Sequence, residues 1–221
     1  MELGYHYRSL IRTLNKLIEP TTGQVWLDAG CGPAKMSELI WEKSGGSLKK
    51  IVGIDIVLNC AEERAQRIPV LELKCGNLGE TLDFENNTFD GIISNIALPY
   101  VIEFEGIYGK EGIQKVFCEM SRVLKPGGQF IWSTPNTNMQ TWLMGVSIAP
   151  DVIRNITNIP SPKIASRLLY HARQLKKKGK NGTYTYLNPK DWDVLLSKAG
   201  FINCTWKHVI SHQVWVNKCY K

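Results

Sequence analysis

The stretch Val25–Ser37, which reads VWLDAGCGPAKMS, decides the fold of this chain. An apolar run ends in a glycine-rich turn, and the turn leads into residues that suit the start of a helix. Backbone N–H groups at a helix start lack partners and carry partial positive charge, so they can hold a carboxylate or a phosphate. Glycines let a ligand approach the backbone closely. The stretch therefore predicts a strand, a turn and a helix around a nucleotide-type ligand.

Two features of this turn argue against a dinucleotide such as NAD. The third glycine of the dinucleotide fingerprint is absent, because Lys35 stands three residues after Gly32. Asp28 lies two positions before Gly30, where its charge would repel a pyrophosphate and attract a cationic amine. An NAD-dependent oxidoreductase is thus the disfavoured interpretation.

The run Asp28–Gly32 resembles the first motif of the class I S-adenosylmethionine-dependent methyltransferases, in the branch of small, single-domain enzymes that act mostly on small molecules. The resemblance implies S-adenosylmethionine as cofactor and S-adenosylhomocysteine as product. It also implies that Asp28, Gly30, Cys31 and Gly32 bind the cofactor, whose methionyl tail carries an ammonium and a carboxylate beside the sulfonium. A tight turn without a ligand is the alternative, because short motifs are hypotheses.

A second apolar run, Ile51–Asp55, ends on a carboxylate 23 residues after Gly32. Such a run is typical of a parallel strand that is buried on both faces. A carboxylate at the carboxyl end of the neighbouring strand can accept hydrogen bonds from both ribose hydroxyls. We therefore predict Asp55 as the ribose ligand, with Ile56 beside it in the cofactor site. An aspartate that ends a strand or caps a helix is the alternative.

Two further segments extend the resemblance. Val70–Leu78 reads as a third strand with a turn, and Thr81–Asn95 as a loop that leads into a fourth strand. In the family, the residue aligned with Asn77 is usually an aspartate that accepts from the adenine amino group, and the next backbone N–H meets the ring. The resemblance thus implies Asn77 and Leu78 as cofactor ligands, with a neutral acceptor in place of a charged one. An ordinary turn asparagine is the alternative.

The end of the fourth strand should border the reacting methyl group. We assign Ser94 and Asn95 to the cofactor site and Tyr100 to the catalytic residues. The family's DNA and protein amino-group methylators carry Asn-Pro-Pro-Tyr here, whereas this chain reads SNIALPY, which argues against a base or a glutamine amide as acceptor. If an oxygen or carbon acceptor must lose a proton, His171 and His208 are the candidate bases. A surface or packed histidine is the alternative for each.

The order of elements predicts an α/β fold, with a doubly wound, Rossmann-like, seven-stranded and mostly parallel sheet. Helical spacing indicates an amphipathic first helix that ends at Pro20. Leu124–Ser133 reads as a helix stopped by proline and glycines, followed by the fifth strand. A helix opened by Pro189 and a last strand near residues 212–219 follow later, and in the family this last strand inserts antiparallel beside the fifth.

Residues 137–186 do not fit this alternation, so we interpret residues 1–221 as one methyltransferase domain with a helical lid inserted after the fifth strand. Between Val152 and Lys190 there are nine basic residues and no acidic ones, in a chain of net charge +7. A basic lid over the pocket would suit an anionic acceptor or RNA, and lysines that only solvate a helix face are the alternative. Few aromatic residues accompany the basic ones and no RNA-binding module is appended, which favours a small molecule over nucleic acid.

Composition bounds the remaining possibilities. No apolar run approaches the ~20 residues that span a bilayer. The amino terminus is charged and aromatic and does not resemble a signal peptide, so we expect a cytoplasmic protein. We expect a monomer or a homodimer. Six cysteines without a C-x-x-C pair predict reduced thiols and no metal site. The sequence thus predicts methyl transfer from S-adenosylmethionine to a small, anionic or aromatic acceptor. An RNA methyltransferase and a non-catalytic, S-adenosylmethionine-binding regulatory protein are the alternatives.

Overall fold

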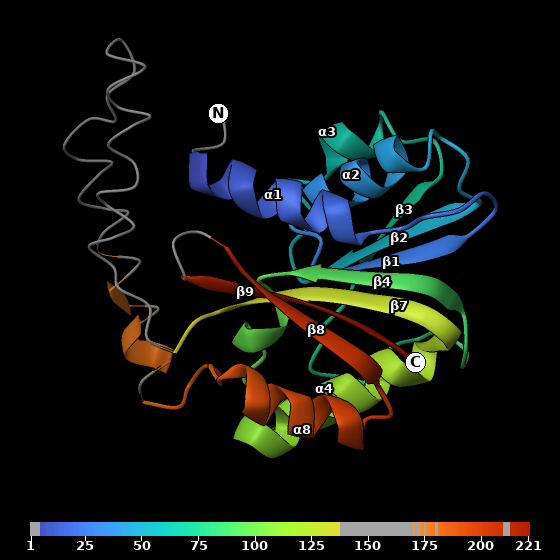
Figure 1. Cartoon of the computed structure of the whole chain (residues 1–221). Coiled ribbons are helices and arrows are strands. Elements are labelled where there is room, and N and C mark those ends of the chain that lie inside the picture. Colours follow the sequence, from blue (N-terminus) through green and yellow to red (C-terminus); the bar gives the residue numbers. More distant parts are fainter. Residues whose placement is uncertain (1–4, 138–169, 171–172, 175, 180, 210–212) are drawn as a thin grey trace, which may run out of the picture.

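A seven-stranded sheet forms the centre of the molecule (Figure 1). The computed structural model describes residues 5–137, 170, 173–174, 176–179, 181–209 and 213–221. The strand order is β3-β2-β1-β4-β7-β9-β8. The first five strands in this order pair in parallel, and β9 is antiparallel to both of its neighbours, β7 and β8. The strands are β1 (Val25–Ala29), β2 (Lys50–Asp55), β3 (Leu71–Cys75), β4 (Phe89–Asn95), β7 (Leu124–Pro135), β8 (Ile202–Val209) and β9 (Val214–Tyr220). The predicted fold class, including the antiparallel last strand, is confirmed.

Helices cover both faces of the sheet. In Figure 1, α1, α2 and α3 lie on one face, and α4 and α8 lie on the other. None of these helices is long and apolar enough to cross a membrane, as far as the described residues go. The helices are α1 (Tyr5–Leu17), α2 (Lys35–Lys43), α3 (Glu62–Ala65), α4 (Gly109–Val123) and α8 (Pro189–Lys198), with a short 3₁₀ helix η1 (Leu98–Tyr100) after β4.

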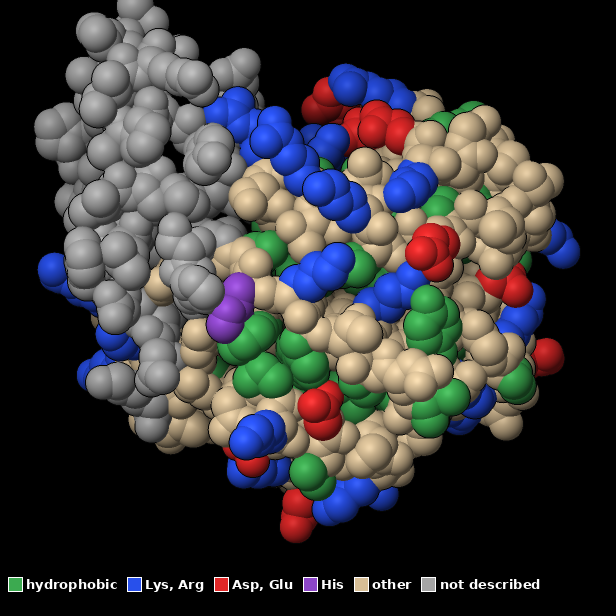
Figure 2. Space-filling view, viewed as in Figure 1, with side chains coloured by type: hydrophobic (Ala, Val, Ile, Leu, Met, Phe, Trp, Pro, Cys, Tyr) green, Lys and Arg blue, Asp and Glu red, His purple; other side chains and the backbone are tan. Residues whose placement is uncertain are grey.

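Helix α1 has the amphipathic character that its spacing predicts. Leu10 and Leu14 are fully buried against the sheet. Arg8, Arg12 and Lys16 follow one another at four-residue intervals and are exposed, and Figure 2 shows Lys and Arg side chains along the outer face of this helix. Burial of the apolar stripe, rather than helix propensity, holds a helix of this length in place.

An aromatic cluster anchors the opposite face. The indole of Trp132, on β7, lies 5.2 Å from the ring of Phe117 on α4 and 4.9 Å from that of Trp192 on α8, measured between centroids. Trp206 of β8 adds a fourth ring at 5.6 Å. Such tilted and edge-to-face contacts stabilise beyond the apolar area that they bury, and they hold α8 on the sheet immediately after the predicted insertion.

The entry into β7 agrees with the predicted helix end, but the strand begins earlier than predicted. The preceding helix ends at Val123 with Leu124 as its C-cap, so Pro126 follows the C-cap by two residues, as predicted for a helix end. The proline and glycines themselves lie within β7, whose pairing with β4 shifts between Leu124 and Gln129. Proline cannot donate a ladder hydrogen bond, so residues 125–128 bulge from the sheet and regular pairing resumes at Gln129.

A small hairpin follows η1 that the sequence pattern does not predict. It consists of β5 (Glu103–Phe104) and β6 (Ile107–Tyr108), which pair antiparallel. Its turn residues Glu105 and Gly106 both have positive φ, 48° and 82°, as a two-residue hairpin turn requires. Strands of two residues carry no readable alternation, and Gly106 is the only local signal of the turn.

Most of the predicted insertion lies outside the described residues, and so does His171. The described positions 170, 173–174 and 176–179 are helical. The end of the insertion meets the strand ends directly, because the Thr185 N–H donates to the Pro99 carbonyl at 3.0 Å. The single-domain interpretation with a helical lid stays a prediction.

Candidate functional site

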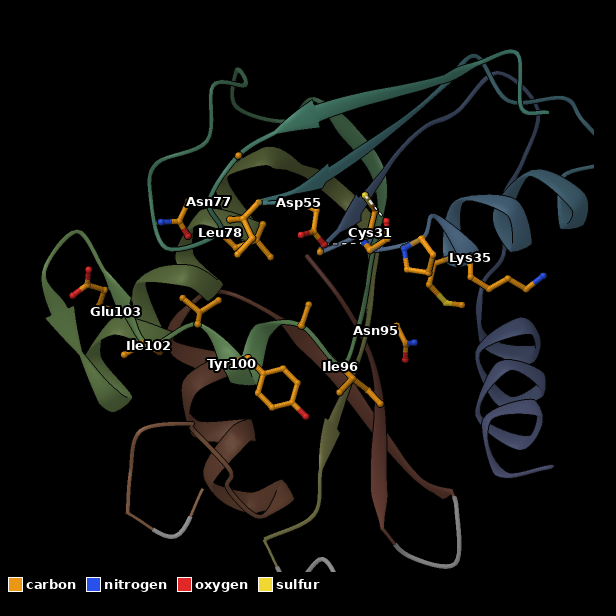
Figure 3. Close-up of a pocket in the computed structure, with 18 of the residues that line it drawn as sticks. Cys31, Lys35, Asp55, Asn77, Leu78, Asn95, Ile96, Tyr100, Ile102 and Glu103 are labelled. Atoms are coloured by element: carbon orange, nitrogen blue, oxygen red, sulfur yellow. Dashed lines mark hydrogen bonds between the residues drawn. The ribbon is translucent and has the colours of Figure 1, made fainter. Parts of the chain in front are cut away.

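A pocket of about 890 Å³ opens at the carboxyl ends of the parallel strands (Figure 3). In an open parallel sheet this is where ligands bind. The walls come from the glycine turn after β1, the ends of β2, β3 and β4, and the β5–β6 hairpin. The lining residues are Gly30, Cys31, Gly32, Pro33, Lys35, Met36, Asp55, Ile56, Gly76, Asn77, Leu78, Asn95, Ile96, Ala97, Tyr100, Val101, Ile102, Glu103 and Tyr108.

The glycine turn is fixed by the neighbouring strand. The N–H groups of Gly30 and Cys31 both donate to the Ile54 carbonyl, at 2.8 and 3.0 Å. The Gly32 N–H donates to the Asp55 carboxylate at 2.8 Å, and the Val57 N–H donates to the other carboxylate oxygen at 3.1 Å. Asp55 thus ties the turn to the end of β2 and still presents its remaining lone pairs to the pocket that it lines.

Asp28 lies beneath the turn rather than on the pocket wall. It is fully buried, and one carboxylate oxygen accepts from the Ser37 N–H at 2.9 Å and from the Ser37 hydroxyl at 2.7 Å. The other oxygen, Oδ1, is buried without a hydrogen-bond partner. Burial raises the pKa of this carboxyl from 3.8 to about 6, although both Ser37 hydrogen bonds oppose the shift.

This raised pKa predicts a pH-dependent stability. The folded protein binds the Asp28 proton more tightly than the unfolded chain does, so the stabilisation is fully present below pH 3.8 and is lost as the pH rises through about 6. At 1.36 kcal/mol per pKa unit, the loss is about 3 kcal/mol. Urea unfolding at several pH values across this window should show the free energy of unfolding of the wild type falling relative to that of Asp28→Asn. Parallel pH profiles for the two proteins would contradict the assignment.

The Cys31 side chain packs between the turn and β2, and its thiol is not reactive. Its side chain is 4% exposed, and its sulfur packs against Gly53 of β2, where an added Cβ would lie 3.2 Å away. Burial, with the nearby charges of Asp28 and Asp55, raises the pKa of the thiol to about 12. The thiol therefore stays protonated at neutral pH and is no nucleophile.

Asn77 and Leu78 both line the pocket, as predicted, but Asn77 is already engaged. Its amide oxygen accepts from the Gly79 N–H at 2.9 Å, and its amide nitrogen donates to the Glu80 carboxylate at 2.9 Å. The first of these bonds is the turn geometry that the alternative interpretation describes. Leu78 is buried and forms the floor beside it.

The residues predicted at the end of β4 divide into two groups. Ser94 is fully buried and donates to the Ala29 carbonyl at 2.7 Å, so it ties β4 to β1 and does not line the pocket. Asn95 lines the pocket, and its amide oxygen accepts from the Ser133 hydroxyl at 2.8 Å. Tyr100 also lines the pocket, and burial raises the pKa of its phenol.

The two histidines are not brought to this pocket by the described structure. His208 lies on β8, which is separated from β4 by β7 and β9, and its ring packs against Trp215. The prediction of His208 as a base therefore has no geometric support, because the edge position of β8 keeps it away from the other strand ends. His171 lies outside the described residues.

The sequence pattern did not predict several residues that line the pocket. Ile102, Glu103 and Tyr108 belong to the hairpin region, and Met36 and Ile96 add apolar surface near the turn. Glu103 and Tyr108 are cross-strand partners in the hairpin. Only the folded arrangement brings this hairpin to the end of β3.

Comparison with known proteins agrees with the fold. Residues 27–132 match the family model described as a methyltransferase domain. Demethylmenaquinone methyltransferase of Bacillus cereus is 32% identical over 121 residues, which cover 52% of this chain and 46% of that protein. The chain thus matches about half the length of this relative.

Two solved structures share the fold across nearly the whole chain. A SAM-dependent methyltransferase from Aquifex aeolicus superposes with a TM-score of 0.60 at 15% identity, covering 96% of this chain and 89% of that one. Phosphoethanolamine N-methyltransferase 2 of Haemonchus contortus, solved with S-adenosyl-L-methionine, gives 0.64 at 15% identity, covering 96% and 51%. Residues 27–132 thus match a methyltransferase domain, and the chain has the fold of these methyltransferase structures.

The residues of the pocket fit this cofactor chemically. A Cβ at Gly32 would meet no atom within 4 Å, so the turn leaves room for a ligand against its backbone. The Asp55 carboxylate matches a ribose diol, and the unpartnered Asp28 oxygen places negative potential beneath the turn, which suits a cationic tail. We therefore take this pocket as the candidate cofactor site.

Proposed function

We propose that this protein transfers the methyl group of S-adenosylmethionine to a small aromatic acceptor with neutral or anionic character. The carrying observation is one pocket in which the glycine turn and Asp55 lie on one side and an uncharged wall lies on the other. That wall is formed by Asn95, Ile96 and Tyr100 after β4. Among the described residues, this wall carries no carboxylate that would bind a cationic amine, whereas a flat apolar ring would find matching surface.

The chain's own residues would act mainly by positioning. Bound S-adenosylmethionine supplies a methyl group already activated by the sulfonium. The turn around Gly32 would hold its charged tail and Asp55 its ribose, which leaves the methyl end near Asn95 and Tyr100. Correct orientation with exclusion of water can contribute ~7–11 kcal/mol to lowering such a barrier.

Tyr100 would contact the acceptor as an aromatic wall and a hydrogen-bond donor. Its ring packs edge-on against Tyr184 at 4.9 Å and against Tyr186 at 6.2 Å, between centroids. Burial raises the pKa of both Tyr100 and Tyr186, so these phenols stay protonated at neutral pH. Tyr100 can therefore donate to an acceptor oxygen and is poorly suited to remove a proton.

Two further observations support this acceptor class. The relative from Bacillus cereus is named for demethylmenaquinone, and the match to it covers 52% of this chain. The segment that precedes Tyr184 and Tyr186 is basic, with Lys178 placed 5.1 Å from the centroid of the Tyr184 ring. Positive charge beside an aromatic wall favours an ionised phenol or an aromatic acid over a cation.

Calorimetric titration followed by turnover tests this proposal. We expect micromolar binding of S-adenosylmethionine and S-adenosylhomocysteine and none of NAD. Release of S-adenosylhomocysteine should then occur with hydroquinones, catechols or aromatic acids and not with a transfer RNA transcript. Binding of NAD alone would overturn the cofactor assignment. Binding without turnover on any acceptor would favour the regulatory alternative, and turnover on RNA alone would overturn the acceptor class.

A further inference from the structure

Two carboxylates line the pocket among the described residues, Asp55 and Glu103. Both oxygens of Asp55 accept backbone N–H groups, from Gly32 and Val57, and these bonds fix Asp55 at the end of β2. Glu103 lies farther along the pocket, on the β5–β6 hairpin. Figure 3 shows Glu103 and Asn77 at one end of the pocket and Asn95 at the other, with Asp55 between them.

The hairpin is packed closely against the loop that carries Asn77. A Cβ added to Gly79 would lie 2.4 Å from the Glu103 carbonyl oxygen and 3.2 Å from the Asn77 amide oxygen, so both groups border the same point. The Glu105 N–H donates to the Gly79 carbonyl at 2.9 Å. The Glu105 carboxylate accepts from the Thr81 N–H at 3.1 Å and from its hydroxyl at 2.7 Å. These bonds hold Glu103 in place beside Asn77.

The strand order indicates which part of a nucleoside ligand reaches this end. The turn follows β1, Asp55 ends β2, and Asn77 follows β3, and these strands are adjacent in that order. A ligand that places its tail at the turn and its ribose at Asp55 therefore extends its base toward Asn77 and Glu103. An adenine base brings an amino group there, which requires hydrogen-bond acceptors.

Asn77 offers only the remaining lone pair of a neutral oxygen. Its amide oxygen already accepts the Gly79 N–H, and its amide nitrogen is turned to Glu80. Glu103 offers a charged acceptor at the same end. Tyr108 is its cross-strand partner in the hairpin, and the nearby Glu103 carboxylate raises the pKa of the Tyr108 phenol.

We propose that Glu103 accepts a hydrogen bond from the amino group of adenine and thereby selects adenine nucleosides over those with a carbonyl in its place. This inference rests on the proposed function, because it deepens the cofactor site of the same pocket. The β5–β6 hairpin then forms the outer wall of the adenine subsite, with Glu103 as the group that reads the base.

Paired titrations test the role of Glu103. S-adenosylhomocysteine and its deaminated analogue S-inosylhomocysteine, in which a carbonyl replaces the amino group, would be titrated into the wild type, Glu103→Gln and the control Glu111→Gln. Glu111 lies on α4, outside this pocket. The wild type should prefer the adenosine ligand at least about tenfold, since a carboxylate repels the carbonyl. Glu103→Gln should lower that preference at least about fivefold because its amide can donate to the carbonyl. Glu111→Gln should keep it.

The outcomes separate this inference from the proposed function. An unchanged preference in Glu103→Gln, or no preference in the wild type, would overturn the role of Glu103 while leaving the cofactor site in place. An equal loss of affinity for both ligands in Glu103→Gln would show that the residue only supports the hairpin, and would also overturn the inference. Failure of the wild type to bind either ligand would instead overturn the cofactor assignment itself.

Discussion

Replacing Asp55 with alanine should raise the dissociation constant for S-adenosylhomocysteine roughly 10- to 150-fold, in keeping with a loss of about 1.5–3 kcal/mol from charge-assisted hydrogen bonds. The side chain would lose its contacts to the ribose, and the Gly32 N–H would lose the acceptor that fixes the turn at 2.8 Å. The substitution would therefore weaken both the binding of the ligand and the hydrogen bonding that fixes the turn. Titration calorimetry at constant pH and salt measures the effect.

Two further variants sharpen this expectation. Asp55→Asn keeps one oxygen as acceptor without the charge, so its affinity should fall between those of the wild type and Asp55→Ala. Asp83→Ala removes an exposed aspartate outside the pocket and should bind as the wild type does. Equal affinities for Asp55→Ala and Asp83→Ala would remove Asp55 from the site.

Replacing Gly30 with alanine should lower the free energy of unfolding by about 2–5 kcal/mol, the sum of a left-handed backbone cost and an overpacking cost. Gly30 has φ of +77°, which disfavours a side chain, and an added Cβ would lie 2.3 Å from the Cβ of Ala97. The turn after β1 and the loop after β4 would be forced apart at the wall of the pocket. Urea denaturation without ligand measures the loss, and cofactor affinity should fall as well.

A matched glycine isolates the contact from the backbone effect. Gly127 has φ of +75°, and a Cβ there would meet no atom within 4 Å, so Gly127→Ala should cost only about 1–2 kcal/mol. The double variant Gly30→Ala with Ala97→Gly removes the clash and should recover part of the loss. Equal destabilisation by Gly30→Ala and Gly127→Ala, without recovery in the double variant, would contradict the close approach of turn and loop.

The strand–turn–helix unit and its acidic neighbour were predictable because their signals are local. The run from Val25 to Ser37 carries its own periodicity and its own glycines, and Asp55 ends an apolar run at the spacing of an adjacent parallel strand. The structure places both at the pocket. Asn77, Leu78, Asn95 and Tyr100 reach it as well, since parallel strands share one carboxyl edge.

Other predictions depended on distances that no local pattern encodes. Asp28 and Ser94 lie on the predicted strands, yet their side chains point into buried hydrogen bonds and not into the pocket. His208 follows the predicted helix–strand order, but its strand lies at the far edge of the sheet. Whether a side chain reaches the pocket depends on the face of the strand on which it lies and on the place of that strand in the sheet order.

The sequence by itself determined the sheet class, the glycine turn and the place of Asp55 at the end of β2, because each follows from a pattern within one or two elements. Only the tertiary structure decided the depth of Asp28, the engagement of Asn77 and the placement of the β5–β6 hairpin with Glu103 beside it. The physical reason is that burial and hydrogen bonding depend on which segments become neighbours in space. The hairpin contacts residues 79–81, which lie about 24 positions earlier in the chain. Strands of two residues have no sequence pattern from which such a contact could be predicted.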